Sequence, residues 1–371
     1  MNIGFDAKRA FFNRSGLGNY SRSTIQILSR YFSENNYFLF TPTLKKSISF
    51  IKAENIRFVE PEGKFDCFFK SYWRTFKLTK QLQENKIDVY HGLSNELPKT
   101  IGRAKTKSLV TIHDLIFIRY PELYKVIDRK IYEMKFRFSS RMADKVIAIS
   151  EQTKNDLIEF FDISPSKIEV VYQGCNAAFY EQLDRNAKKQ VREKYNLPAQ
   201  YILSVGTIEE RKNVLNIVKA LNTAQIEIPL VVIGRATPYL QTIKQYIREN
   251  KLEKQILFFH NVPLQDLPAL YQMAEVFVYP SVFEGFGIPI LEALNSKVPV
   301  ITSRGGCFSE AGGPSSIYVQ ANNPEELSDA IKSVLSDSEK RKKMIEDGLI
   351  YAQNFRDEKI AQNLMKVYLS L

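Results

Sequence analysis

The sequence predicts an α/β protein made of two doubly wound, Rossmann-like domains. At 371 residues, the chain is too long for one ordinary hydrophobic core and suits two domains of roughly 150–200 residues each. Short apolar runs alternate with helix-like segments along the whole chain, which is the rhythm of parallel sheets covered by helices. No repeated sequence relates the halves, so this alternation alone indicates two similar domains.

The first half opens with a strand predicted over residues 3–6, a loop that contains Gly16 and Gly18, and a helix over 19–31. Further short apolar runs predict strands over 37–40, 89–90, 109–112, 145–149 and 169–172. Polar or helix-like segments separate these runs, as expected when a crossover joins each strand to a parallel neighbour.

The second half repeats the pattern. Strands are predicted over 201–205, 230–233, 256–259, 276–279 and 298–302, and helices over 214–221, 238–250, 264–273, 288–295 and 324–335. Strand character is lost near 175–195, so we predict a first domain over 1–182 and a second over 183–356. Residues 357–371 form a last predicted helix with no strand after it, and a return to the first domain is one interpretation of it.

Composition excludes several classes of protein. No stretch approaches about 18 uninterrupted apolar residues, so no transmembrane helix is expected. The first residues read as a strand and not as a secretory signal. The three cysteines, Cys67, Cys175 and Cys307, are odd in number and scattered, which fits neither a disulfide framework nor a zinc site. We therefore expect a cytoplasmic protein.

The net charge of +11 suggests an anionic partner. Nucleic acid is not expected, because no nucleic-acid-binding motif is present and the basic residues are spread over the chain. The densest basic stretch is 125–145, predicted as a helix on which Lys130, Arg137, Arg141 and Lys145 share one arc, interrupted by Ile127 and Met134. Two interpretations remain: a solvated helix face, or peripheral contact with the inner face of an anionic membrane or with an anionic acceptor.

The strongest chemical signal lies in residues 278–303. A strand ends at Tyr279, a loop carries Glu284, Gly285, Phe286 and Gly287, and a helix begins near Pro289. Proline suits a first helical turn, because its missing N–H would be unpaired there. Glycines at a helix N-terminus leave backbone amides open to phosphate or sugar hydroxyls. Glu292 falls eight residues after Glu284 and therefore lies deeper along the helix.

A second signal lies in residues 201–221. A strand leads into Gly206, and Glu209, Arg211 and Lys212 open the next helix. Basic residues are normally unfavourable at a helix N-terminus, so an anionic ligand is expected there. Arg211 can bind two oxygens through its planar guanidinium, while Lys212 acts as a point charge. The pair could hold a diphosphate.

Two weaker signals lie in the first half. His113 directly follows a predicted buried strand, a favourable position for a site in an α/β sheet. His91 also follows a strand, and we leave open whether it lines the acceptor side. Gly16 and Gly18 follow the first strand; alone, a Gly-x-Gly pair is weak evidence.

The segment around Glu284 and Glu292 resembles the Glu-seven-residues-Glu motif of retaining glycosyltransferases with the GT-B fold, in particular family four. That fold has two Rossmann-like domains facing a central cleft. The resemblance implies that Glu284 lies beside the donor sugar, that Glu292 binds the ribose hydroxyls, and that the amides of 285–287 contact sugar and phosphate. Residues 206–213 are similar to the family's Gly-x-x-x-x-x-Lys-Asn pattern, in which Arg211 and Lys212 would grip the pyrophosphate.

The same resemblance extends to the remaining candidates. The His-Asp segment at 113–114 is similar to that of mannosyltransferase-like members, where the histidine reaches the donor sugar. Gly16 and Gly18 would belong to a loop over the diphosphate, and Val262, in the loop after the strand 256–259, would face the donor base. The implied catalytic residues are thus His113 and Glu284; Gly206 joins the donor-binding set.

The resemblance implies a retaining, metal-independent transfer of a sugar from a nucleotide-sugar to a glycan or lipid-linked acceptor in cell-surface polysaccharide synthesis. GDP-mannose is the favoured donor, and UDP- and dTDP-linked sugars are the alternatives. No metal or other cofactor is expected. One alternative is a catalytically inactive nucleotide-sugar-binding protein of the same fold. A Rossmann-type dehydrogenase is a weaker one, because Ser21 stands where its third fingerprint glycine would be.

Overall fold

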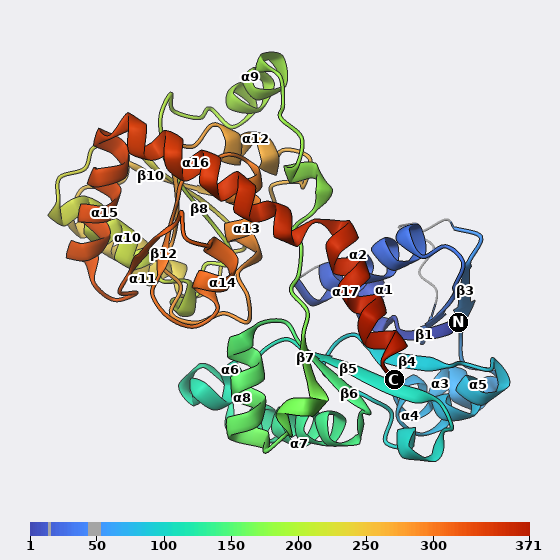
Figure 1. Cartoon of the computed structure of the whole chain (residues 1–371). Coiled ribbons are helices and arrows are strands. Elements are labelled where there is room, and N and C mark those ends of the chain that lie inside the picture. Colours follow the sequence, from blue (N-terminus) through green and yellow to red (C-terminus); the bar gives the residue numbers. More distant parts are fainter. Residues whose placement is uncertain (14–15, 44–52) are drawn as a thin grey trace. The chain divides into compact units, whose positions relative to one another are not determined.

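The computed structural model describes residues 1–13, 16–43 and 53–371, and the chain forms two compact units (Figure 1). The first unit contains residues 1–173 together with 356–371, and the second contains 174–355. The last helix, α17 (Asp357–Leu369), therefore belongs to the first unit, where it packs against α2 (Gly16–Tyr31). Each unit is a parallel sheet covered by helices.

The sheet of the first unit has seven strands in the order β3-β2-β1-β4-β5-β6-β7. Every described pairing is parallel, and Phe5 pairs with Leu39 on one side and His91 on the other. The strands are β1 (Asn2–Asp6), β2 (Asn36–Phe40), β3 (Ile56–Val59), β4 (Val89–Gly92), β5 (Lys107–Ile112), β6 (Lys145–Ala148) and β7 (Ile168–Val170).

Two hydrophobic clusters cover the two faces of this sheet. One contains α2 and α17, where Ile360, Leu364 and Tyr368 recur at four-residue spacing and are buried. The other contains Trp73 and Leu82. The remaining helical elements are α1 (Lys8–Phe12), α3 (Lys64–Phe68), α4 (Lys70–Tyr72), the π-helical turn η1 (Trp73–Lys77), α5 (Leu78–Glu84), α6 (Ile116–Arg119), α7 (Val126–Met142) and α8 (Glu151–Phe161), with short 3₁₀ turns η2 (Ile101–Arg103), η3 (Pro121–Leu123) and η4 (Pro165–Lys167).

The sheet of the second unit has six strands in the order β10-β9-β8-β11-β12-β13, again all parallel in the described pairings. The strands are β8 (Ile202–Val205), β9 (Leu230–Ile233), β10 (Ile256–Phe259), β11 (Val276–Tyr279), β12 (Val300–Ser303) and β13 (Ile317–Val319). The helical elements are η5 (Ala177–Phe179), α9 (Arg185–Lys194), η6 (Glu210–Lys212), α10 (Val214–Thr223), α11 (Leu240–Glu249), α12 (Leu267–Gln272), α13 (Ile288–Asn295), α14 (Phe308–Gly312), α15 (Pro324–Ser336), α16 (Ser338–Ala352) and η7 (Gln353–Phe355).

The predicted α/β class, with two doubly wound sheets, is confirmed. Two strands were missed, β3 and β13, and both lie at a sheet edge, where a strand is short and half exposed. Helix α2 begins at Gly16 and not near residue 19. The sequence pattern predicts residues 174–182 in the first domain, but they lie in the second unit, because Phe179 is buried there with its ring 5.4 Å from that of Tyr271.

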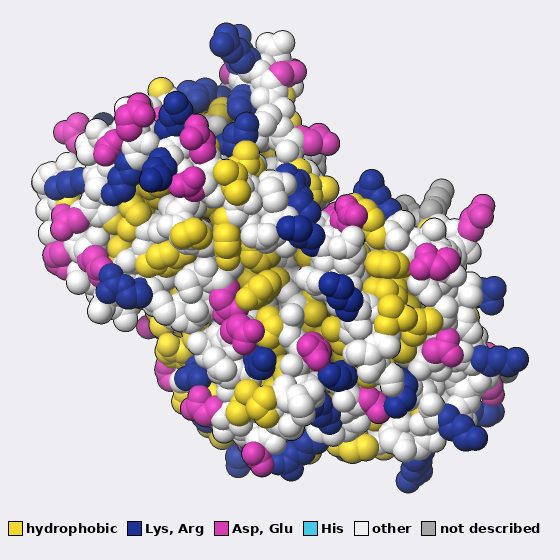
Figure 2. Space-filling view, viewed as in Figure 1, with side chains coloured by type: hydrophobic (Ala, Val, Ile, Leu, Met, Phe, Trp, Pro, Cys, Tyr) yellow, Lys and Arg dark blue, Asp and Glu magenta, His cyan; other side chains and the backbone are white. Residues whose placement is uncertain are grey.

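The surface is basic without one dense basic tract in the view of Figure 2, where Lys and Arg side chains are scattered among acidic and hydrophobic ones. Within residues 1–13, 16–43 and 53–371, no helix is long and apolar enough to cross a membrane.

Candidate active site

The strand order of the second unit places two candidate segments side by side. From β8 the chain moves outward to β9 and β10, and it then returns to place β11 on the other side of β8. Ligands of such sheets sit beyond the carboxyl ends of the strands at this reversal of order. Gly206, Arg211 and Lys212 follow β8, and Glu284 follows β11, so these residues meet at the reversal.

Glu284 forms ion pairs with both predicted phosphate-binding cations. Lys212 Nζ lies 2.6 Å from Glu284 Oε1, and Arg211 Nη1 lies 2.8 Å from Oε2. The three side chains are only 11–16% exposed. At this degree of burial charges interact much more strongly than they do in water, so the three side chains act as one electrostatic unit.

Two hydroxyl groups complete the environment of Glu284. Tyr279 and Ser281 donate hydrogen bonds to Oε1 over 2.9 and 2.6 Å. Burial by itself would raise the pKa of this carboxyl, but the charges of Lys212 and Arg211 outweigh burial and hold the pKa at about 2. Glu284 is therefore ionised throughout the neutral range.

Arg211 is also bound by a second carboxylate. Its Nη2 lies 2.7 Å from Glu209 Oε1, and its Nη1 donates to the Phe283 carbonyl over 2.5 Å. The cluster of Glu209, Arg211, Lys212 and Glu284, called the ion cluster below, thus contains two cations and two anions. An incoming diphosphate would compete with these carboxylates for the same donors.

Glycines shape the two loops that form the ion cluster. Gly206 has φ +155° directly after β8, and Gly287 has φ +112° at the N-cap of α13. Residues that carry a side chain rarely adopt these backbone angles. Pro289 lies in the first turn of α13, where its missing N–H costs nothing. These residues therefore end each strand in an abrupt turn and direct the following segment across the edge of the sheet.

Glu292 lies on α13 and is separate from the ion cluster. Its Oε2 accepts a hydrogen bond from the buried Tyr271 hydroxyl over 2.8 Å. Burial raises the pKa of Glu292 to about 7, against the smaller opposite effect of that hydrogen bond. Among the described residues no donor reaches Oε1, so one carboxylate oxygen is available to a ligand.

The other donor-side candidates lie in the loops at this sheet edge. Phe286 is buried, with its ring 5.7 Å from that of Phe355, so it could contact a ligand only through its backbone. Gly285 and Val262 are half-buried. Val262 follows β10 by way of His260, whose Nδ1 lies 2.6 Å from the carbonyl oxygen of Gly234.

Gly16 and Gly18 lie in the first turn of α2 in the first unit. A Cβ on Gly18 would lie 1.8 Å from the carbonyl oxygen of Asn13, so only glycine allows the end of α1 to approach α2 this closely. Ser15, which precedes this turn, lies outside the described residues.

His113 follows β5 and is buried. Its Nε2 donates to the Leu93 carbonyl over 2.9 Å, since a carbonyl oxygen can only accept. Asn95 Oδ1 accepts from its backbone N–H, and the Tyr20 ring lies 4.7 Å away at 90°. Burial lowers the pKa to about 4, so the ring is neutral at pH 7 and its Nδ1 carries a lone pair. Within the described part of the chain, no group hydrogen-bonds to that Nδ1.

His91 is fully buried and makes its hydrogen bonds within the first unit. Its Nδ1 lies 2.7 Å from the Tyr368 hydroxyl and its Nε2 lies 2.8 Å from Thr111 Oγ1. Burial lowers its pKa to about 3. Both ring nitrogens are thus used, so His91 does not line an acceptor site.

Sequence reasoning missed the residues that complete the site. Tyr279, Ser281 and Tyr271 supply the hydroxyl groups on the two glutamates. Tyr279 and Ser281 could have been suspected, because they lie in the same strand-loop-helix motif as Glu284. Tyr271 lies on α12 and could not have been, since no pattern in the sequence links it to Glu292.

The first unit carries its own charged cluster at the equivalent reversal of strand order, between β1 and β4. Arg74 Nη2 lies 2.5 Å from Asp6 Oδ2, and Arg74 Nη1 lies 2.8 Å from Glu96 Oε2. The cavity beside them has a volume of about 20 Å³, which suffices for one water molecule. It is too small for a sugar.

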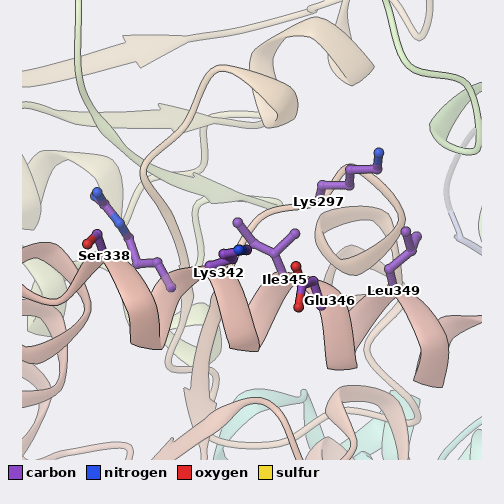
Figure 3. A pocket seen from close by; sticks show the side chains of 7 residues that line it. Lys297, Ser338, Lys342, Ile345, Glu346 and Leu349 are labelled. Atoms are coloured by element: carbon purple, nitrogen blue, oxygen red, sulfur yellow. The ribbon is translucent and has the colours of Figure 1, made fainter.

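A larger surface pocket of about 430 Å³ lies along α16 (Figure 3). It is lined by Lys297, Ser338, Arg341, Lys342, Ile345, Glu346 and Leu349. Lys297 lies three residues before the start of β12 at Val300, so this pocket lies near the amino end of that strand, whereas Glu284 follows the carboxyl end of β11. None of the candidate residues lines it. Within the described residues no group of three or more His, Cys, Asp or Glu side chains could hold a metal ion together.

Comparison with known proteins gives the class. Residues 185–350 match the family described as glycosyl transferases group 1, and residues 23–179 match Glycosyltransferase Family 4. The chain is 30% identical over 293 residues to the O-antigen chain mannosyltransferase B of Escherichia coli, a match that covers 77% of this chain and 75% of that protein.

Solved structures share the fold. A glycosyltransferase from Rickettsia africae has a TM-score of 0.79 at 20% identity and covers 100% of this chain and 98% of its own. Anabaena HepE, solved in complex with UDP and glucose, has a TM-score of 0.77 at 17% identity and covers 100% and 99%. The fold and the family matches together define a glycosyltransferase of the GT-B fold. Within that class, the chain belongs to glycosyltransferase family 4.

Proposed function

We propose that this enzyme transfers mannose from GDP-mannose, with retention of anomeric configuration and without a metal ion. The proposed acceptor is a glycan or lipid-linked glycan of a cell-surface polysaccharide. The observation that carries the proposal is the ion cluster, in which Arg211, Lys212 and Glu284 meet at the reversal of strand order. The mannose assignment draws on the Escherichia coli relative, which is named an O-antigen chain mannosyltransferase.

Arg211 and Lys212 are proposed to bind the donor diphosphate. The bond between the anomeric carbon and phosphate breaks in the reaction, so negative charge grows on the departing diphosphate. A guanidinium and an ammonium fixed in a site with little water can stabilise that charge. This is the task that a divalent cation performs in other transferases, and the cation pair is proposed to replace it.

Glu284 is proposed to lie beside the transferred sugar. Its pKa of about 2 keeps it negative, so it can stabilise positive charge at the anomeric carbon but cannot act as a general acid near pH 7. We assign no covalent nucleophile, because diphosphate oxygens can themselves accept the proton of the acceptor hydroxyl.

The remaining donor contacts follow from which atoms are available. Glu292 is proposed to accept hydrogen bonds from the ribose hydroxyls through its open Oε1. The backbone amides of residues 285–287 and Gly206 are proposed to contact sugar and phosphate, and Val262 to face the base. Gly16 and Gly18 are proposed to approach the diphosphate, where the absence of side chains lets a backbone come close.

His113 is proposed to contact the sugar as a hydrogen-bond acceptor. Because its Nε2 donates to Leu93 and its ring is neutral at pH 7, Nδ1 can accept a hydrogen bond from a sugar hydroxyl. This role requires an oriented lone pair and no change of protonation.

We further propose peripheral contact with an anionic membrane through α7. The segment 125–141 holds six basic and two acidic residues, and the apolar side chains of Val126, Ile127 and Met134 are exposed there. Exposed apolar groups among basic ones are typical of helices that lie at a membrane surface. Such a contact would bring the enzyme to a lipid-linked acceptor.

A thermal-shift screen with GDP, UDP and dTDP tests the donor assignment. A ligand at 100 times its dissociation constant should stabilise the protein by about 2.7 kcal/mol, and we expect this for GDP. The product formed from GDP-mannose is then analysed by NMR for its anomeric configuration. Stabilisation by UDP or dTDP alone would contradict the donor assignment, and an inverted product would contradict retention.

A further inference from the structure

A continuous row of buried hydrogen bonds connects the C-terminal helix with the neighbour of His113. Tyr368 on α17 bonds to His91 Nδ1 over 2.7 Å, and His91 Nε2 bonds to Thr111 Oγ1 over 2.8 Å. Thr111 Oγ1 bonds in turn to the Tyr20 hydroxyl over 2.9 Å. The four side chains come from four different elements, and all are buried. We call Tyr368, His91, Thr111 and Tyr20 the buried relay.

The donors of the buried relay can all point one way. His91 is neutral, so one ring nitrogen donates and the other accepts. If Tyr368 donates to Nδ1, then Nε2 donates to Thr111, and Thr111 donates to Tyr20. This direction gives the hydrogens of Tyr368, His91 and Thr111 an acceptor and leaves the Tyr20 hydroxyl free to donate to Thr24, with which it also hydrogen-bonds. The reverse would leave the Tyr368 hydroxyl hydrogen without an acceptor among the described residues. Hydrogen bonds aligned in this way strengthen one another.

Tyr20 restricts rotation of the His113 ring about its Cβ–Cγ bond, a motion that the hydrogen bond from His113 to Leu93 restrains only weakly. Nε2 lies close to the axis of rotation about the Cβ–Cγ bond, so the bond to Leu93 limits rotation of the ring only weakly. The Tyr20 ring stands at 90° to it with the centroids 4.7 Å apart, in a favourable edge-to-face contact. Rotation would move Nδ1, the atom proposed to meet the sugar.

We propose that Tyr368 and His91 are positioning residues, which act through Thr111 and Tyr20 to fix the orientation of the His113 ring and of the adjoining turn at Gly16 and Gly18. The inference rests on the proposed contact between His113 and the sugar. It assigns α17 a part in catalysis without any contact with substrate.

The competing interpretation is that Tyr368 only anchors α17 to its sheet. The helix already buries Ile360, Ala361, Leu364 and Met365 in the first unit. Tyr368→Phe removes one hydrogen bond and leaves these apolar contacts intact, so the variant should fold with α17 in place. The fold therefore does not need this hydroxyl, and its role can be measured on its own.

The test is a double-mutant cycle between Tyr368→Phe and His113→Ala, followed by donor turnover and by nucleotide affinity. Tyr368→Phe should lower kcat about tenfold, because a 1 Å misplacement in a site can cost about 100-fold and rotation of the His113 ring is a smaller displacement. It should leave the Kd for GDP within twofold. In the His113→Ala background it should change kcat no further. Multiplicative effects of the two substitutions, or unchanged kcat in Tyr368→Phe, would overturn the proposal.

Tyr37→Phe is the matched control. Tyr37 is a buried tyrosine of the same unit, and its hydroxyl donates to the carbonyls of Leu28 and Phe32, outside the buried relay. It should lose similar stability yet keep kcat. An equal loss of kcat in this control would show that Tyr368 matters only for stability.

A readout without turnover separates this inference from the proposed function. The chain has three histidines, so ring ¹⁵N resonances can be assigned from single variants. His91 should be the Nε2–H tautomer, and Tyr368→Phe should shift the ring resonances of His113, which it does not contact, while Tyr37→Phe should not. If the wild-type protein transfers no sugar, the proposed function fails and this spectrum alone decides: an unmoved His113 signal overturns the buried relay, and a shifted one supports it.

Discussion

Lys212 Nζ lies 2.6 Å from Glu284 Oε1, although the two residues are 72 positions apart in the chain. The contact joins the loops after β8 and β11 and couples two roles that the sequence assigned separately, diphosphate binding and stabilisation of the sugar. A change at either residue should therefore alter both. This coupling determines what substitutions in the ion cluster are expected to do.

Glu284→Gln should lower turnover and at the same time tighten nucleotide binding. The substitution removes the negative charge beside the sugar, for which we expect a loss of kcat of about 100-fold. It also frees Arg211 and Lys212 from their counter-ion, so GDP should bind about tenfold tighter. Turnover at saturating donor and titration calorimetry with GDP measure the two effects.

The same variant should be less stable without ligand. Removing one partner of a buried ion pair costs about 3–5 kcal/mol; here it leaves Lys212 without its carboxylate and Arg211 with Glu209 alone, and GDP should restore much of this loss. Weaker GDP binding by Glu284→Gln would show that the carboxylate supports the diphosphate site and does not compete with it.

Glu209→Gln should tighten GDP binding without altering the chemical step of sugar transfer. Glu209 is more exposed than Glu284, and it contacts Arg211 over 2.7 Å. Because solvent screens it more, the gain in affinity should be smaller, about three- to fivefold. Slower release of the nucleotide, measured by stopped-flow displacement, should account for most of the gain.

Glu210→Gln is the matched control for Glu209→Gln. It removes the same charge one residue further along, from an exposed side chain. Long-range electrostatics would affect both variants equally, whereas direct competition for Arg211 affects only Glu209→Gln. Equal affinities of the two variants for GDP would contradict the assigned role of Glu209.

The sequence predicted the interior strands of both sheets and the edge strands β7 and β10, but it missed the edge strands β3 and β13. Fully buried strands such as β9 and β11 are continuous apolar runs, and these are visible in a sequence. Strand β3 is half exposed, and β13 has three residues. Their pairing comes from a neighbouring strand and not from their own composition, so the sequence pattern could not show them.

The candidate site was predictable where local sequence carries it. Glycines, a proline and charged residues at strand ends mark Gly206, Arg211, Lys212 and Glu284, and the structure brings these last three side chains into contact. Contacts between elements were not predictable. The hydrogen bond from Tyr271 to Glu292 and the row that joins His91 to Tyr368 depend on packing between distant segments.

Affinity for GDP should rise with pH through 7 because of Glu292. In the free protein burial holds its pKa at about 7, so below that pH the carboxyl is mostly protonated. Ribose hydroxyls donate to the ionised form, and binding therefore lowers the pKa. Affinity should fall by up to about tenfold per pH unit below 7 and level off above it, as measured by calorimetry between pH 5.5 and 8.5.

Glu292→Gln separates the titration of Glu292 from that of the nucleotide, whose terminal phosphate ionises with a pKa of about 6. The variant should bind GDP more weakly at pH 8, by about 1–2 kcal/mol, and should keep only the pH dependence of the ligand. If both proteins show the same dependence, Glu292 does not bind the ribose.

Transfer should survive removal of divalent metal ions. Arg211 and Lys212 are proposed to supply the positive charge at the diphosphate, so activity after dialysis against EDTA should equal that of untreated enzyme. Activity that EDTA abolishes and Mg²⁺ or Mn²⁺ restores would show that the cation pair does not suffice. The nucleotide's own affinity for Mg²⁺ is controlled by measuring GDP binding with and without the ion.

Membrane contact through α7 should depend on its exposed apolar side chains. Ile127 and Met134 lie seven residues apart, so they share one face of the helix. Replacing both with Gln keeps the charge of the protein and should reduce cosedimentation with phosphatidylglycerol-containing vesicles by at least about tenfold. Each basic residue near the surface adds about 1 kcal/mol, so vesicles of phosphatidylcholine alone should bind even the wild-type protein weakly.

Ile350→Gln is the control for this experiment. Ile350 lies on α16 and is 70% exposed, against 72% for Ile127, so the two positions present similar apolar surface in different units. Loss of a general hydrophobic attraction would affect both, while a specific contact affects only α7. If Ile350→Gln weakens vesicle binding as much as the α7 variant does, or if neither changes it, α7 is not the membrane-binding surface.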